Sequence, residues 1–328
     1  MDLNGKKILI ENDAGLGDNI MFTPTLRAIK EMYPQCELSF LVKPVSAENI
    51  RGISYIDHVY ETGGFLGDYS LLPVILKQDV LICTTWQPQI IRMAYCLGVK
   101  YRVSRYKQKY ENTSLAHKWI KPTDSKDINR TDIIAREIGE ALGIELRITD
   151  QTDLAPYETT DKQIVDDWLG NAKDKYVVIA PFSTRKDKDI PYDLLRKIIS
   201  YITKECQTMC VVVGRAKQPG DEELENCIDL RGKTTLPQLK CLIANSDYVI
   251  SADSGPMHMS CALRKKTIAI FTRYSPKAWA PKTFCYPVSA NVDCIHCDNG
   301  YADQCKNKIC RDRLTFDMVL EKINLIDK

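Results

Sequence analysis

The chain has 328 residues, of which 44% are hydrophobic and 27% are charged, and its formal net charge is +2. These values are typical of an ordinary globular protein and exclude a fibrous, disordered or strongly basic chain. No segment is apolar over the roughly 18 residues of a membrane span, and the first residues do not have the pattern of a secretory signal. We therefore expect a cytoplasmic protein, with two domains of roughly 150 residues each.

Short apolar segments alternate with segments of helical periodicity along the chain. The alternation predicts strands and helices in two groups, with strands at 6–12, 37–43, 79–85, 175–181, 209–214, 247–253 and 266–272, and helices after the first strand and at 89–97, 132–142, 192–205, 236–244 and 256–263. Residues 145–162 are polar and aperiodic, so we expect a linker there. The pattern indicates an α/β fold of two doubly wound, mostly parallel domains, 1–155 and 156–328, that face a central cleft.

The first motif, "ENDAGLGDNIMFTPTLRAIK", covers residues 11–30. Gly15 and Gly17 allow a tight turn and the close approach of a ligand, although a dinucleotide fingerprint would need another glycine. Asp18 has two interpretations, which the residues alone leave open. It is a helix N-cap, worth about 1 kcal/mol, or it lies at the mouth of a site and accepts a proton. Pro24 either kinks the helix or begins a new one capped by Thr23.

The segment from residue 100 to residue 121 is strongly basic. Its charged residues are one acid, Glu111, and seven cations, namely Lys100, Arg102, Arg105, Lys107, Lys109, Lys118 and Lys121. Such a segment favours an anionic partner. The alternative is a solvated surface stretch.

Two further motifs each follow a predicted strand. In "APFSTRKDKDIP" (180–191), the hydroxyls of Ser183 and Thr184 are suited to phosphate oxygens. Lys188, or failing it Arg185 or Lys186, is suited to a departing diphosphate. The alternative for this motif is a charged surface loop.

In "ISADSGPMHMSCAL" (250–263), the chain turns through Asp253, Ser254 and Gly255 into a helix with Pro256 at a favoured first position. The amides of a helix N-terminus bind phosphate groups. Asp253 is suited to a sugar hydroxyl, and His258 lies near the same helix end. The alternative is an ordinary capped and buried helix.

The chain contains 13 cysteines, mostly isolated among apolar residues, which indicates reduced thiols. A cluster in the loop 294–310 is different, because Cys294, Cys297, Cys305 and Cys310 could close a tetrahedral site for zinc or iron. Such a metal would be structural and not catalytic. The alternative is four reduced cysteines without a metal.

Together the motifs resemble the ADP-heptose:lipopolysaccharide heptosyltransferase family, inverting glycosyltransferases of the GT-B type. The resemblance rests on "GLGDNIMFTPTLRAIKEMYP", "PFSTRKDKDIP" and "ADSGPMHMSCAL", in this order. It implies that Asp18 is the general base and that Lys188 steadies the leaving diphosphate. It also implies donor contacts from Gly15, Gly17, Ser183, Thr184, Asp253, Ser254, Gly255, Pro256 and His258, and acceptor contacts from Arg102, Arg105, Lys107 and Lys109.

The resemblance implies an N-terminal acceptor domain and a C-terminal nucleotide-sugar domain. We expect transfer of heptose from ADP-heptose to a hydroxyl of an anionic acceptor such as the lipopolysaccharide core, near the inner membrane surface and without a catalytic cofactor. The family's ribose-binding acid has no clear match, and Asp221 and Glu222 are the candidates. The alternatives are another nucleotide-sugar donor with a protein or nucleic-acid acceptor, a nucleotide-sugar epimerase or hydrolase, and a non-catalytic binding protein.

Overall fold

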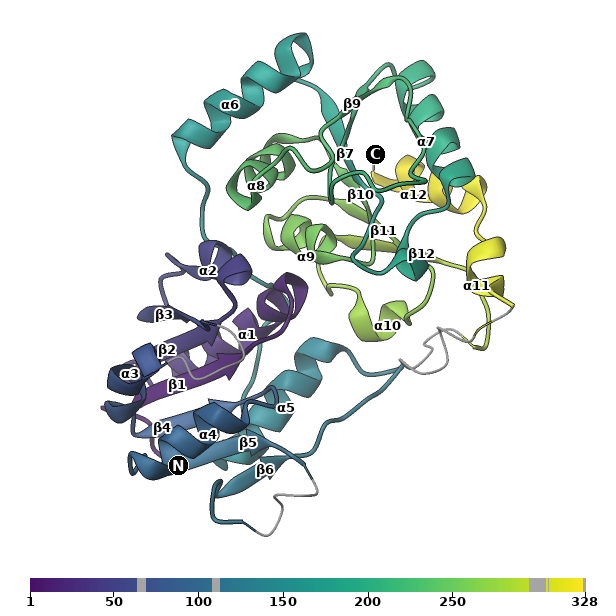
Figure 1. Cartoon of the computed structure of the whole chain (residues 1–328). Coiled ribbons are helices and arrows are strands. Elements are labelled where there is room, and N and C mark those ends of the chain that lie inside the picture. Colours follow the sequence, from purple (N-terminus) through teal and green to yellow (C-terminus); the bar gives the residue numbers. More distant parts are fainter. Residues whose placement is uncertain (64–68, 108–112, 295–304, 306, 327–328) are drawn as a thin grey trace. The chain divides into compact units, whose positions relative to one another are not determined.

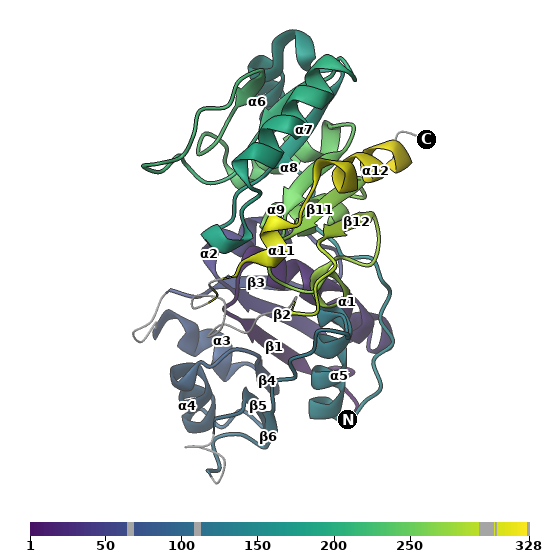
Figure 2. The same ribbon diagram turned by 90° about the vertical axis from the view of Figure 1, so that its right-hand side faces the viewer.

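The computed structural model describes residues 1–63, 69–107, 113–294, 305 and 307–326. The chain divides into two compact units (Figures 1 and 2). The first comprises Met1–Asp124 and Arg130–Ala155, and the second comprises Ser125–Asn129 and Pro156–Lys328. Each unit contains a parallel sheet with helices, so the predicted α/β class is confirmed.

The described part of the first unit contains a six-stranded sheet in the order β3-β2-β1-β4-β5-β6. Its strands are β1 (Lys7–Asn12), β2 (Glu37–Val42), β3 (His58–Glu61), β4 (Val80–Cys83), β5 (Tyr101–Arg105) and β6 (Lys118–Ile120). Its helices are α1 (Leu16–Met32), α2 (Pro44–Ile50), α3 (Leu72–Leu76), α4 (Pro88–Cys96) and α5 (Arg130–Leu142). The strand order reverses between β1 and β4, and in such sheets ligands bind outside the carboxyl ends of the strands at this point.

Helices cover both faces of this sheet, which explains why its central strands β1, β2 and β4 are largely apolar and buried. Leu9, Leu41 and Leu81 pack against the cluster formed by α3 and α4. Phe40 points to the opposite face, where its ring lies 5.5 Å from that of Phe22 on α1. The core therefore fixes the ends of β1 and β4 from both sides.

Helix α1 runs through Pro24 without a new start. A proline in a helix leaves the carbonyl four residues earlier without its usual amide donor. Here the hydroxyl of Thr23 donates to that carbonyl, on Ile20, at 2.7 Å. Of the two interpretations of Pro24, the fresh helix start capped by Thr23 is therefore wrong.

The described part of the second unit repeats this arrangement, with the strand order β12-β11-β10-β7-β8-β9 and the reversal between β7 and β10. Its strands are β7 (Tyr176–Ala180), β8 (Met209–Val212), β9 (Cys227–Asp229), β10 (Val249–Ala252), β11 (Thr267–Phe271) and β12 (Cys285–Ser289). Its helices are α6 (Thr159–Leu169), α7 (Tyr192–Lys204), α8 (Leu236–Asn245), α9 (Gly255–Ala262), α10 (Pro276–Trp279), α11 (Ile309–Asp312) and α12 (Phe316–Ile326).

One side of this second sheet packs against α7 and α12, through residues such as Ile198 and Ile323. The predicted linker is partly wrong, because α6 begins at Thr159 and so includes the last four residues of 145–162. The polar composition of that segment suits a solvent-exposed first helical turn as well as a linker, since Asp161 stands at the third position of α6.

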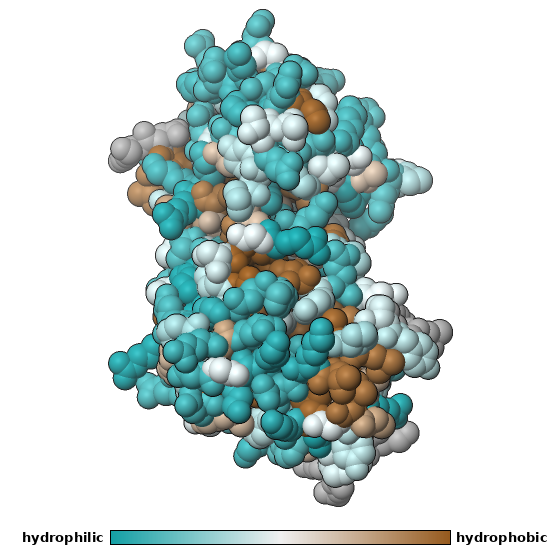
Figure 3. All heavy atoms as spheres, turned by 90° about the vertical axis from the view of Figure 1, so that its left-hand side faces the viewer, coloured by the Kyte–Doolittle hydropathy of each residue, from teal (hydrophilic) through white to brown (hydrophobic). Residues whose placement is uncertain are grey.

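The surface is mainly hydrophilic on the face drawn in Figure 3, with hydrophobic side chains gathered in a few patches. Exposed large hydrophobic residues include Tyr69, Leu76 and Tyr95, in and around α3 and α4. Within the described ranges, none of the helices combines the length and the apolar character needed to cross a bilayer.

Candidate functional site

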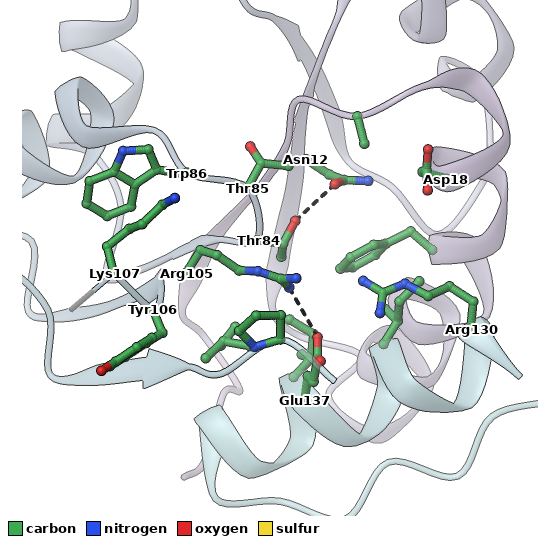
Figure 4. A pocket seen from close by; sticks show the side chains of 16 residues that line it. Asn12, Asp18, Thr84, Thr85, Trp86, Arg105, Tyr106, Lys107, Arg130 and Glu137 are labelled. Carbon is green, nitrogen blue, oxygen red and sulfur yellow. Dashed lines mark hydrogen bonds and ion pairs between the residues drawn. The ribbon is translucent and has the colours of Figure 1, made fainter. Parts of the chain in front are cut away.

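A pocket of about 370 Å³ opens in the first unit, where its strand order reverses. Its walls come from the segments after β1 and β4, from the end of β5 and from α5 (Figure 4). The polar and aromatic lining residues are Asn12, Asp18, Phe22, Thr84, Thr85, Trp86, Arg105, Tyr106, Lys107, Arg130 and Glu137. The pocket therefore lies at the place where doubly wound sheets bind ligands.

Asp18 lines this pocket and also belongs to the helix end, but it is not the N-cap. The N-cap of α1 is Gly15, and Asp18 stands at the third helical position. Its Oδ2 accepts a hydrogen bond from the Gly15 amide at 3.3 Å. The partial positive charge of a helix N-terminus favours a carboxylate at this position. Gly15 has an ordinary φ of −73°, and neither Gly15 nor Gly17 is among the described residues lining this pocket.

Hydrogen bonds join the end of β1 to the end of β4 beneath the pocket. The side chain of Asn12 donates to Asn19 at 2.9 Å and accepts from the Thr84 hydroxyl at 3.1 Å. Glu11 is fully buried and accepts from the Asp13 amide at 2.7 Å and from the Thr85 hydroxyl. Burial raises the pKa of Glu11 to about 7, although these hydrogen bonds oppose the shift. This network fixes the turn between β1 and α1, the helix whose first turn carries Asp18.

Three cations face the same pocket, against the two acids Asp18 and Glu137. Arg105 lies 3.5 Å from Glu137, and only 22% of its side chain is exposed. Arg130 donates to the Thr123 carbonyl at 3.2 Å. The ammonium of Lys107 lies 6.0 Å from the centre of the Trp86 ring (Figure 4). The excess of cations suits an anionic group on a ligand.

The structure brings only part of the predicted acceptor set to this pocket. Arg105 and Lys107 line it, whereas Lys109 lies outside the described residues. Arg102 is buried and turned to the backbone, because its guanidinium donates to the carbonyls of Val99, Ser114 and Leu115. We therefore leave Arg102 out of the proposed site.

Sequence reasoning named Asp18, Arg105 and Lys107 among the lining residues and missed the others, which include Thr84, Thr85, Trp86, Arg130 and Glu137. Thr84 and Thr85 end the strand predicted at 79–85 and Trp86 follows it, and residues in this position converge at the carboxyl edge of a parallel sheet. Their position at the end of a predicted strand could therefore have marked them as candidates for the site. The sequence did not show which face of the helix at 132–142 points to the pocket, so it gave no signal for Glu137.

A second charged cluster lies in the other unit, at the carboxyl ends of β7 and β10. Lys188 ends the short 3₁₀ helix Lys186–Lys188, and Asp253 directly follows β10. The Lys188 ammonium lies 2.9 Å from Oδ2 of Asp253, and the two side chains are 15% and 4% exposed. Of the three candidate cations, Arg185 pairs with Asp187 and Lys186 is exposed. Lys188 is therefore the one joined to the start of α9.

The start of α9 combines backbone amides with a buried histidine. Ser254 is the N-cap, and Gly255 and Pro256 form the first turn. His258 is 3% exposed, and its Nδ1 has no hydrogen-bond partner within the described part of the chain. Burial, and then the charge of Lys188, lower the pKa of His258 to about 3, so the imidazole is neutral. A neutral ring can offer a ligand a donor or an acceptor.

The hydroxyl pair of the phosphate loop is divided between the interior and the surface. Ser183 is buried, its amide donates to Asp189 at 2.7 Å, and its hydroxyl accepts from the Arg185 amide at 3.3 Å. Thr184 is exposed. Ser183 therefore fixes the loop to the interior, whereas Thr184 is accessible to solvent and to a ligand.

The two candidates for a ribose-binding acid are both engaged elsewhere. Asp221 accepts hydrogen bonds from Arg215, which hold the pKa of this carboxyl well below its usual range. Glu222 pairs with Arg196. A nucleotide could contact either carboxylate only by breaking an ion pair.

The cysteine cluster lies only partly within the structure. Cys294 is exposed and Cys305 and Cys310 are half-buried, while Cys297 lies outside the described residues. Across the described ranges, no group of three or more histidine, cysteine or acidic side chains could hold a metal ion. The four-cysteine metal site therefore stays a prediction.

Two doubly wound units, each with polar groups at the reversal of its strand order, define a GT-B type of architecture. The chain belongs to glycosyltransferase family 9 (heptosyltransferase), whose sequence pattern matches residues 75–314. The predicted family and fold are thus confirmed.

Three similar proteins illustrate this membership. Lipopolysaccharide heptosyltransferase 3 of Escherichia coli K12 is 26% identical over 296 residues, which cover 81% of this chain and 83% of that protein. The family 9 glycosyl transferase of Veillonella parvula superimposes with a TM-score of 0.82 at 15% identity, over 99% and 98% of the two chains. The ADP-heptose lipopolysaccharide heptosyltransferase II of E. coli gives 0.75 at 16% identity, over 98% of each chain.

Proposed function

We propose that this family 9 protein is an inverting glycosyltransferase that moves heptose from ADP-heptose to a hydroxyl of an anionic acceptor such as the lipopolysaccharide core. The observation that carries the proposal is the pocket of the first unit, in which the Asp18 carboxylate and the cations Arg105, Lys107 and Arg130 line one cavity. A base beside an anion-binding wall suits an acceptor that bears both a hydroxyl and a negative charge. The donor is suggested by the ADP-heptose in the name of the E. coli relative.

In this proposal Asp18 is the general base. The acceptor oxygen attacks the anomeric carbon of the donor, and its proton passes to the Asp18 carboxylate. The bond from the anomeric carbon to the diphosphate oxygen breaks, and its electron pair leaves with ADP. Attack opposite the leaving group inverts the anomeric configuration. A well-placed base of this kind accelerates the reaction about 10²- to 10⁴-fold.

Lys188 and the N-terminus of α9 are the proposed site of the diphosphate. Helix amides and an ammonium compensate the charge that grows on the leaving group, which is the task that a divalent metal performs elsewhere. In the structure Lys188 is paired with Asp253. We propose that the diphosphate takes the ammonium from this carboxylate, and that Asp253 then accepts a hydrogen bond from a sugar hydroxyl. Ser183, Thr184 and neutral His258 complete the proposed donor contacts.

Calorimetric titration with ADP, UDP, GDP and CDP in EDTA tests the donor assignment. We expect selective binding of ADP, weakened at least about tenfold by Lys188→Ala because one charge-assisted contact is lost. Lys186→Ala is the matched control, since this exposed lysine belongs to the same short helix. Binding of no nucleotide, or preference for another nucleotide, would overturn the assignment of ADP-heptose.

A further inference from the structure

The segment 272–275, between β11 and α10, contacts the loop that carries Lys188 through a hydrogen bond and an ion pair. The hydroxyl of Thr272 donates to the Asp187 carbonyl at 2.8 Å. The guanidinium of Arg273, which is only 3% exposed, pairs with the Asp187 carboxylate. Because these contacts involve the residue next to Lys188, the segment and the loop form one connected piece at the carboxyl edge of the second sheet, between β11 and α10 in Figure 1.

This piece places an aromatic ring against the Lys188 ammonium. Nζ of Lys188 lies 4.6 Å from the centre of the Tyr274 ring, well within the range of a cation–π contact. The ring is itself held in place, because Trp279 lies 5.5 Å away and the Arg273 guanidinium 4.9 Å away. Tyr274 is half-buried, and burial raises its pKa, so the phenol is neutral at physiological pH.

A bound diphosphate would affect the two contacts of Lys188, with Asp253 and with the Tyr274 ring, in different ways. The carboxylate of Asp253, at 2.9 Å, competes with an anionic ligand for the ammonium. The face of an aromatic ring attracts a cation but carries no net charge. It therefore does not repel the anionic ligand, and both can contact the ammonium at once. A lysine has a long flexible stem, and a ring that restricts it reduces the entropy lost when the ammonium meets its ligand.

We propose that Tyr274 is a positioning residue of the donor site, whose ring holds the Lys188 ammonium in place before and after a nucleoside diphosphate binds. This inference rests on the proposed role of Lys188 and adds a residue that none of the sequence motifs contains. Tyr274 acts through Lys188, by restricting where its charge can lie.

A double-mutant cycle with ADP as the titrated ligand tests this proposal. Tyr274→Leu removes the ring, whereas Tyr274→Phe keeps its face and removes only the hydroxyl. We expect Tyr274→Leu to weaken ADP binding about threefold to thirtyfold, and Tyr274→Phe to stay within about twofold of the wild type. In a Lys188→Ala background, Tyr274→Leu should cause no further loss, because the ring then has no ammonium to hold.

The outcomes separate this inference from the proposed function. If the wild type does not bind ADP, the donor assignment fails, and the role of Tyr274 fails with it. If the wild type binds ADP and Tyr274→Leu binds equally well, only the role of Tyr274 is wrong. An equal loss in the Lys188→Ala background would show a merely structural effect and would also overturn it. Thermal unfolding monitors the fold of each variant, and Tyr274→Met replaces Tyr274→Leu in the same cycle if the leucine variant does not fold.

Discussion

Replacing Asp18 by asparagine should separate its catalytic role from its role at the helix end. Asparagine has nearly the same shape but cannot accept the proton of the acceptor. We expect kcat to fall about 10²- to 10⁴-fold, which corresponds to about 3–5 kcal/mol of activation free energy at 1.36 kcal/mol per tenfold change. The stability cost should be much smaller. The amide oxygen can still accept from Gly15, at the 3.3 Å now seen for the carboxylate, and the lost charge at a helix N-terminus is worth about 0.3–1 kcal/mol.

Asp161 provides a matched control in the same chain. It occupies the third position of α6, and its carboxylate accepts from the Glu158 amide at 3.4 Å, as Asp18 accepts from Gly15. Asp161→Asn should therefore lower the free energy of unfolding by a similar amount and leave kcat unchanged. Transfer would be followed as ADP release with a saturating acceptor, and stability by urea unfolding. An Asp18→Asn variant that turns over within a few-fold of the wild type would refute the reasoning, as would an equal loss of activity in Asp161→Asn.

Three further predictions follow from the pocket, the buried acid and the cysteines. Lys107→Glu should raise the acceptor KM about tenfold and leave the donor KM unchanged. The control is Lys118→Glu, an exposed change on β6 outside the pocket lining, which should alter neither KM. An unchanged acceptor KM in Lys107→Glu would contradict the cationic wall. The pKa of Glu11 is raised from 4.5 to about 7, so this carboxyl stays protonated to a higher pH in the folded state than in the unfolded state. The free energy of unfolding should therefore fall by roughly 3 kcal/mol as pH rises from about 4.5 to 7. Glu11→Gln should flatten this dependence, and parallel pH profiles in urea unfolding would show that the acid is not responsible. Tag-free protein should contain about one equivalent of zinc or iron, lost when the four cysteines of the 294–310 loop become serine; less than about a tenth of an equivalent in the wild type would remove the metal site.

The strands that the sequence predicted are those buried on both faces, because continuous apolar segments such as 175–181 have few other interpretations. Strand β3 was not predicted, since its residues are only half-buried or exposed and only two of its four residues, Val59 and Tyr60, are hydrophobic. Strand β9 has three residues, too few for a period to be recognised.

The site shows the same division between local and tertiary information. Asp18 and Lys188 belong to local motifs, and the structure finds both beside a pocket or cluster at a sheet reversal. Arg102 could not be told from Arg105 by sequence, because they are three positions apart in a basic segment and only the fold turns Arg102 to the backbone. Tyr274 contacts Lys188 across 86 positions of the chain, a distance that no local pattern conveys.

Incubation of the protein with ADP-heptose and a heptose-deficient lipopolysaccharide core, in EDTA, tests the central claim most directly. Product would be analysed by nuclear magnetic resonance for a new glycosidic bond and its anomeric configuration. We predict that ADP is released only when the acceptor is present and that the configuration is opposite to that of the donor. Donor consumption at the same rate without the acceptor, or a product with retained configuration, would contradict an inverting transferase with Asp18 as its base.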